Sequence, residues 1–115
     1  MDHKELDVWK VAMELVEDAY RISAKFPDHE RYGLTSQLRR SAISIPSNIS
    51  EGSGRKSNKE LIQFLSISLG SLAELETQYL IAIRLEYIKK GQFLGKITRL
   101  RKLLIGFRNH IKKQN

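Results

Sequence analysis

Residues 57–88 read SNKELIQFLSISLGSLAELETQYLIAIRLEYI, which is the longest uninterrupted helical pattern in the chain. The first four residues match a capping box, in which the side chains of Ser57 and Glu60 each accept a hydrogen bond from the other residue's backbone N–H. No proline interrupts the stretch, and its roughly 32 residues would extend over about 48 Å as an α-helix. The sequence therefore predicts one long helix from Ser57 to Ile88.

This predicted helix carries two rows of mostly apolar residues. The first row has heptad-like spacing and consists of Leu61, Leu65, Ser68, Leu72, Leu75, Tyr79 and Ala82. The second row, about one residue round the helix, consists of Phe64, Ile67, Ser71, Gln78, Ile81, Leu85 and Ile88. Because two rows exceed what the neighbours in a monomeric bundle need, we expect the second row to support self-association.

Three further segments have the apolar period of a helix, namely Leu6 to Ala24, Thr35 to Gly54 and Phe93 to Ile111. The core face of the first is predicted from spacings of three and four, and consists of Leu6, Trp9, Met13, Val16 and Tyr20. The core face of the second consists of Leu34, Leu38, Ala42, Ile45 and Ile49, and that of the last of Phe93, Ile97, Leu100, Leu104, Phe107 and Ile111.

Pro46 lies inside the second of these segments and lacks the N–H that would bond the carbonyl of Ala42. Two outcomes are compatible with this. The helix kinks at Pro46, or it ends near Ser44 and a new helix begins with Pro46 in its first turn.

Composition narrows the class of protein further. The 115 residues include only two prolines and seven glycines, too few turn residues for a many-stranded sandwich or barrel. The chain has no cysteine, which excludes disulfide scaffolds, cysteine-ligated metal sites and thiol nucleophiles. No apolar run approaches the about 18 residues of a membrane span, and the start of the chain is charged, unlike a signal peptide. We expect a cytoplasmic protein without membrane contact, folded as a single all-α domain over 1–115, an antiparallel up-and-down four-helix bundle.

The net charge of +7 is concentrated at one end of the chain. Residues 1–88 contain 11 basic and 13 acidic residues, whereas residues 89–115 contain nine basic residues and no acidic one. A face that serves only solubility normally mixes both signs, so this asymmetry indicates an anionic partner. The predicted nucleic-acid-binding residues are Lys89, Lys90, Lys96, Arg99, Arg101, Lys102, Arg108, Lys112 and Lys113.

The nature of that partner stays open on charge alone. RNA or DNA would be bound through phosphates, with affinity that falls steeply with salt. An acidic protein or an anionic membrane surface could use the same charges. Of these, the acidic protein gives the alternative hypothesis, a structural or adaptor oligomer without nucleic-acid binding. The only aromatic residues of the segment, Phe93 and Phe107, fall on its core face, so base stacking is not expected.

No pattern indicates catalysis, a cofactor or a metal. The residues around Lys56-Ser57 lack the glycines of a phosphate-binding P-loop and follow a helix instead of a strand. None of the three histidines is paired with another ligand at helical spacing. Since no nucleophile, base and orienting group converge, we expect a protein that is not an enzyme.

Polar residues also line one face of the segment around Pro46, including Arg39, Arg40, Ser44, Ser47, Asn48 and Glu51. One interpretation is a structural network across helices or subunits, with Arg39, Arg40, Pro46, Asn48, Glu51 and Gly52 as its packing and assembly motif. The other is phosphate contact through Arg40, Arg55 and Lys56.

The residues just described resemble those of the bacterial 23S rRNA intervening-sequence family. The run from Ser44 to Gly52, SIPSNISEG, is the most specific part of the resemblance. It extends to Asp7-Val8-Trp9-Lys10, to the run from Arg31 to Arg40, and to residues of the third segment, namely Glu60, Phe64, Leu65, Ser68, Gly70, Ser71, Glu74 and Glu76. Ser41 and Ser50 depart from the family pattern, where alanine is common.

The resemblance implies an up-and-down four-helix bundle that assembles as a barrel-like homopentamer. Genes of some members lie inside intervening sequences of large-subunit ribosomal RNA genes. A related branch comprises accessory proteins of diversity-generating retroelements, whose basic pentamer surface binds nucleic acid and a reverse transcriptase. The family offers no catalytic residues to carry over to this chain. The partners that the resemblance implies are a second copy of the chain, RNA or DNA, and a reverse transcriptase.

Overall fold

The computed structural model describes residues 1–114, so that Asn115, the last residue of the predicted domain, lies outside the described residues. The chain forms four α-helices, α1 (Asp7–Ser23), α2 (Leu34–Ser53), α3 (Asn58–Arg84) and α4 (Phe93–Lys113). Two short 3-10 helices, η1 (His3–Glu5) and η2 (Asp28–Glu30), precede α1 and α2. Residues 1–114 contain no strand, which confirms the all-α prediction.

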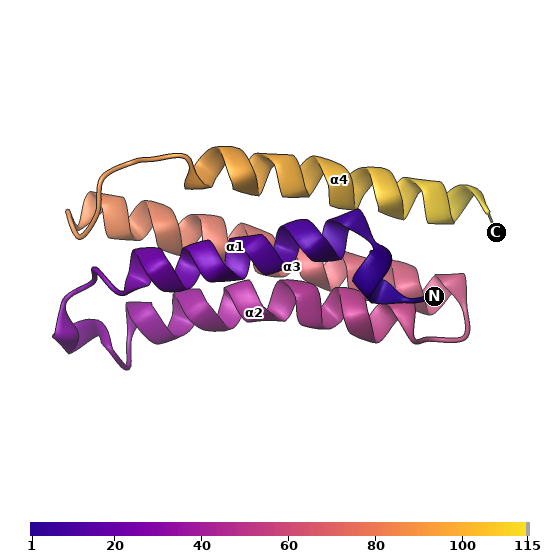
Figure 1. Ribbon diagram of the computed structural model, residues 1–115, viewed down its shortest axis with the longest axis horizontal. Coiled ribbons are helices and arrows are strands. Elements are labelled where there is room, and N and C mark those ends of the chain that lie inside the picture. Colours follow the sequence, from indigo (N-terminus) through magenta and orange to yellow (C-terminus); the bar gives the residue numbers. More distant parts are fainter. Residues whose placement is uncertain (115) are drawn as a thin grey trace.

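The helices lie side by side in an elongated body of 47 × 23 × 20 Å (Figure 1). Neighbouring pairs are α1 with α2, α2 with α3, α3 with α4, and α4 with α1. Within the described part of the chain α2 and α4 do not contact each other, so they occupy opposite corners. Two side-chain hydrogen bonds join α2 to α3. Ser41 bonds Gln78, and Ser44 bonds Ser71.

The predicted core faces of α2, α3 and α4 are confirmed, although Leu34 and Phe107 are only partly buried. The predicted face of α1 is confirmed only in part, because Leu6, Trp9 and Val16 are partly buried against the core but are not its centre. Met13 and Tyr20 are 39% and 41% exposed, and the buried residues are instead Val8, Ala12, Leu15 and Ala19. The larger side chains lie at the edge of α1 with α2, where Met13 and Val16 lie near Pro46 and Tyr20 lies against Arg39.

Helix α2 continues through Pro46 without a break, so of the two alternatives the end near Ser44 with a restart at Pro46 is wrong. Side chains add hydrogen bonds to carbonyl groups near the proline. Ser68 Oγ donates from α3 to the Ile45 carbonyl at 3.0 Å, and Asn48 Nδ2 donates to the Ser44 carbonyl at 2.8 Å. The bond from Ser68 joins α3 to α2, and the bond from Asn48 lies within α2, so both add hydrogen bonds to the part of the helix where proline lacks a backbone donor.

Helix α3 begins as predicted but ends earlier than Ile88. Ser57 caps it by accepting from the Glu60 N–H at 3.2 Å, while Glu60 Oε2 lies 3.3 Å from Ser57 Oγ and not on the Ser57 backbone. At the other end Tyr87 N–H bonds the Ala82 carbonyl, and Glu86 has a φ of 64°. This is a Schellman ending with glutamate in the left-handed position that glycine usually takes, and it stops the helix at Arg84.

Gly52 of α2 lies in close contact with the beginning of α3. A Cβ atom added there would lie 2.7 Å from Phe64 Cβ and 3.0 Å from Leu61 Cδ1. Both neighbours belong to the first turns of α3, so a larger residue would push the two helices apart.

At the other end of the bundle, Glu30 and Tyr87 join the α1–α2 connection to the α3–α4 connection. The Tyr87 hydroxyl donates to Glu30 Oε2 at 2.7 Å, and the Leu34 N–H donates to Glu30 Oε1 at 3.1 Å. These two hydrogen bonds hold the pKa of Glu30 below its usual range, and the bond from Tyr87 has the larger effect. The same bond raises the pKa of Tyr87.

None of the helices described between residues 1 and 114 has both the length and the apolar character to cross a membrane.

Replacing Gly52 by alanine should destabilise the fold by about 1–3 kcal/mol, because its Cβ would overlap Phe64. Gly70 is the matched control, since it lies within α3 and a methyl group added to it would meet no atom within 4 Å. Gly70→Ala should therefore stabilise the fold by up to about 1 kcal/mol. Denaturant unfolding of both variants measures this. Equal shifts in the same direction would contradict a close contact at Gly52.

Tyr87→Phe should cost more stability at pH 7 than at about pH 2.5. A carboxyl group whose pKa is lowered by folding stabilises the fold above its unfolded pKa of about 4.3, and that contribution disappears as pH falls through the folded value. Unfolding of Tyr87→Phe at both pH values tests this, with Tyr32→Phe as the control because Tyr32 is 88% exposed. An equal cost at both pH values would show that Glu30 gains nothing from Tyr87.

Candidate nucleic-acid interface

Three of the predicted basic residues form the outward face of α4. Arg99, Lys102 and Lys113 are exposed, and their spacings of three and eleven residues place them on one side of the helix over about 21 Å. We call these three residues the outer α4 stripe. Gly95 and Gly106 lie on the same face, with no atom within 4 Å of the position a Cβ would take, so this face is open.

The outer α4 stripe has no neutralising partner. Within residues 1–114, no carboxylate lies within ion-pair distance of its three side chains. Lys112 beside it, and Lys89 and Lys90 in the connection from α3, are also exposed and without an ion pair in the described chain. Six of the predicted residues are therefore available to an anionic partner.

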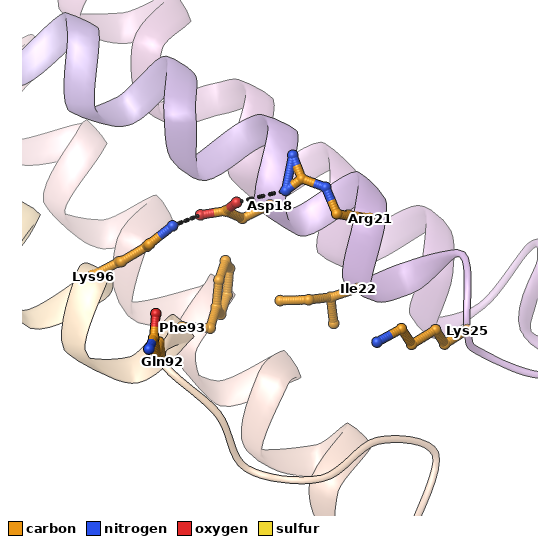
Figure 2. A pocket seen from close by; sticks show the side chains of 7 residues that line it. All are labelled: Asp18, Arg21, Ile22, Lys25, Gln92, Phe93 and Lys96. Atoms are coloured by element: carbon orange, nitrogen blue, oxygen red, sulfur yellow. Dashed lines mark hydrogen bonds and ion pairs between the residues drawn. The ribbon is translucent and has the colours of Figure 1, made fainter.

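Lys96 is held by the bundle itself. Its Nζ lies 2.6 Å from Asp18 Oδ2, while Arg21 contacts the other carboxylate oxygen of Asp18 at 3.0 Å. Figure 2 shows Asp18 between these two cations, beside Phe93 and Ile22. The Asp18 side chain is only 15% exposed, so this ion pair joins α1 to α4 and uses the charge that the sequence assigned to nucleic acid.

Arg101 and Arg108 face α3. Arg101 donates to Glu76 Oε1 at 2.6 Å, and both side chains are 31% exposed. Arg108 donates to Ser66 Oγ at 3.3 Å, and its Nε is buried without a hydrogen-bond partner. The structure therefore divides the predicted set: Lys96, Arg101 and Arg108 contact neighbouring helices, and the other six face outward.

The polar residues of α2 form a buried cluster with α3. Ser41 Oγ donates to Gln78 Oε1 at 2.6 Å, and Ser44 Oγ lies 2.8 Å from Ser71 Oγ. Asn48 Nδ2 joins the cluster at 3.0 Å from Ser44 Oγ. Ser71 and Gln78 are thus inside the bundle, although the sequence placed both in an outward row for self-association. Of that row, Ile67, Ile81 and Leu85 are the exposed residues.

The cluster contains residues that sequence reasoning missed. Ser41 is buried and pairs with Gln78, yet in the sequence it stands out only as a departure from a family pattern. Small polar residues recur at helical spacing on both partners, at Ser41, Ser44 and Asn48 on α2 and at Ser68, Ser71 and Gln78 on α3. Two such rows facing each other are a signal of a buried polar seam, and they could have been matched from the sequence.

The remaining motif residues lie at separate places. Arg40 is exposed on the outward side of α2, and Glu51 forms an exposed ion pair with Arg55 at 3.7 Å. About 20 Å of helix separate Arg40 from the turn that holds Arg55 and Lys56. These three residues therefore cannot meet at one phosphate group.

Residues 1–114 contain no group of three or more histidine or acidic side chains that could hold a metal ion. The arrangement instead offers fixed positive charge on an open helical face, which suits contact with phosphates.

Comparison with known proteins points to one family. The profile of the family described as 23S rRNA-intervening sequence protein matches residues 4–106, so Arg108, Lys112 and Lys113 lie beyond the matched range. A crystal structure of a protein with unknown function from the S23 ribosomal protein family of Bacteroides thetaiotaomicron VPI-5482 is similar, with a TM-score of 0.81 and 26% sequence identity. The similarity covers 95% of this chain and 99% of that chain. No curated protein matches the chain.

Proposed function

The chain belongs to the 23S rRNA-intervening sequence protein family, and on this premise we propose that it is a non-enzymatic homo-oligomer that binds nucleic acid through α4. The observation that carries the proposal is the outer α4 stripe, Arg99, Lys102 and Lys113, which is exposed and has no carboxylate partner in the described chain. Each of these cations placed on a phosphate would release counterions and favour binding.

The proposed contact is with the nucleic-acid backbone. Of the aromatic residues of α4, Phe93 is buried and Phe107 partly buried against the core. The outer α4 stripe therefore has positive charge and open space but no ring on which a base could stack. Recognition by phosphate positions and shape, with little readout of sequence, follows from these residue types.

The proposed assembly is an antiparallel up-and-down bundle that forms a homopentamer. Residue numbers rise along α2 as they fall along α3 in the pairs Ser41–Gln78 and Ser44–Ser71, which supports the antiparallel arrangement. Ile67 and Leu85 on α3 are each 50% exposed and supply apolar area for contact with a second copy. A ring would repeat the outer α4 stripe in every copy and so multiply its charge.

A gel-shift assay with duplex DNA and with ribosomal RNA fragments tests the nucleic-acid proposal. Arg99→Glu, Lys102→Glu and Lys113→Glu combined in one variant should abolish the shift, because three phosphate contacts become repulsive. For the native protein the logarithm of affinity should fall linearly with the logarithm of salt concentration, with a slope of about −2 to −3 for each copy engaged.

The control variant combines Lys10→Glu, Lys25→Glu and Arg84→Glu. These exposed residues lie on α1, just after it, and on α3, and none forms an ion pair in the described chain. The control changes net charge by the same amount, so it should weaken binding only slightly. If both triple variants lose affinity equally, or neither does, α4 is not the binding surface. If the native protein binds an acidic protein but does not bind nucleic acid at low salt, the adaptor hypothesis is favoured.

Light scattering of the purified protein tests the assembly. We expect a mass near five times the 13.3 kDa of one chain. Ile67→Lys combined with Leu85→Lys should lower that mass, whereas Leu80→Lys, at a residue 41% exposed on another side of α3, should leave it unchanged. A mass of one chain for the native protein would refute the oligomer.

A further inference from the structure

A basic recess lies where the end of α1 meets the beginning of α2, at the end of the bundle marked by the first interhelical connection in Figure 1. Its volume is about 500 Å³, within the usual range of small-molecule sites. The residues that line it are three arginines, two tyrosines, two hydroxyl residues and one isoleucine: Arg31, Arg39, Arg40, Tyr20, Tyr32, Thr35, Ser36 and Ile43. No acidic residue lines the recess.

Arg39 is fixed in position before any ligand arrives. Its guanidinium carbon lies 4.5 Å from the centre of the Tyr20 ring, and its Nε donates to Ser23 Oγ at 2.8 Å. Ser23 Oγ in turn donates to the Tyr20 carbonyl at 3.3 Å, which completes the support. Because the side chain is already ordered, binding an anion through its terminal N–H groups would cost little further conformational entropy.

Arg31 and Arg40 add two exposed cations to the recess. Within residues 1–114 no carboxylate lies within ion-pair distance of Arg31, Arg39 or Arg40. The nearby Glu30 forms no ion pair with them, and its two oxygens accept from the Leu34 N–H and from the Tyr87 hydroxyl. The three guanidinium groups of the recess are therefore not engaged in any ion pair of the described chain.

The first turn of α2 supplies additional donors. Thr35 and Ser36 line the recess, and no hydrogen bond in the described chain uses their backbone N–H or hydroxyl groups. Such N–H groups at a helix start, with their positive partial charge, favour an anion. They reinforce the arginine cluster.

Tyr32 gives the recess a flat apolar surface. Its side chain is 88% exposed, and Arg31 lies 5.5 Å from the ring centre. An exposed tyrosine supported by arginine is a platform for a planar ring such as a nucleobase. The outer α4 stripe has no such ring, so the two surfaces suit different parts of a ligand.

We propose that this recess binds a nucleotide that carries a terminal phosphate, with the phosphate on Arg39, Arg40 and Arg31 and the base on Tyr32. The ligand is either a free mononucleotide or the phosphorylated end of a strand, since both present a phosphate monoester beside one base. Helices α2 and α4 occupy opposite corners of the bundle, so the recess is separate from the outer α4 stripe and does not depend on it.

Titration of the labelled protein with 5′-AMP, followed by NMR, tests the recess. The expected shifts are at residues of the recess, and adenosine and inorganic phosphate should each bind at least about tenfold more weakly than 5′-AMP, because each satisfies only half of the site. Arg31→Gln combined with Arg40→Gln should weaken 5′-AMP binding by about tenfold or more. The matched control, Arg55→Gln with Arg84→Gln, should not.

Variants of Tyr32 test the contribution of the base to binding separately from that of the phosphate. Tyr32→Ala should weaken binding of 5′-AMP but leave that of inorganic phosphate unchanged, and Tyr32→Phe should bind like the native protein because it keeps the ring. Absence of 5′-AMP binding at millimolar concentration, or affinity unaffected by the double arginine variant, would overturn the proposal.

A variant that combines Arg99→Glu, Lys102→Glu and Lys113→Glu distinguishes a free mononucleotide from the phosphorylated end of a strand as the ligand of the recess. Tighter binding of a 5′-phosphorylated oligonucleotide than of its 5′-hydroxyl form would identify a strand end, and binding of 5′-AMP alone would identify a free mononucleotide. Either result supports the recess, and equal affinity for 5′-AMP and adenosine contradicts it. Because this background lacks the outer α4 stripe, 5′-AMP binding reports on the recess even if α4 proves irrelevant.

Discussion

The contact between α2 and α3 is the constraint on which the rest of the structure depends. Gly52 lets the two helices meet at one end, and the buried hydroxyl of Ser41 must find Gln78 further along. Because an unpaired buried polar group costs about 1–3 kcal/mol, a shift of one helix along the other would break several bonds at once. The contact therefore fixes the register of α2 and α3, and α1 and α4 pack against a pair that is already aligned. In this bundle Arg39 of α2 lies beside Tyr20 of α1, and the outer α4 stripe faces away from the core.

Acidic residues of α1 and α3 determine which cations of α4 remain available. Asp18 binds Lys96 and Glu76 binds Arg101, so these two charges help to seat the helix. The excess of positive charge in the last part of the sequence thus has two uses, one inside the bundle and one on its surface. At the opposite corner, the arginines of the recess around Arg39 form no ion pair in the described chain, and Glu30 bonds Tyr87 and Leu34 instead.

Sequence periodicity predicted the four helices and the core faces of three of them, because the apolar rows of α2 and α4 and the first row of α3 are the buried ones. It failed in part for α1, where Val8, Ala12, Leu15 and Ala19 form the core face and Met13 lies at its edge. The end of α3 was missed because Glu86 takes a conformation that glycine usually marks. Within the candidate interface, the sequence identified the basic segment but could not separate Lys96 from Lys102, since that distinction depends on Asp18, far away in the chain. The recess was missed for the same reason, because its residues meet only after α1 and α2 pack together.

Mapping of nucleic-acid contacts onto the labelled protein by NMR tests the central claim most directly, namely that α4 presents its uncompensated cations to nucleic acid. At low salt, the account predicts that a duplex lacking terminal phosphates shifts the signals of Arg99, Lys102 and Lys113, while those of Lys96 and Arg101 change little. Shifts confined to α1 and α2, with the outward face of α4 unaffected, would contradict it.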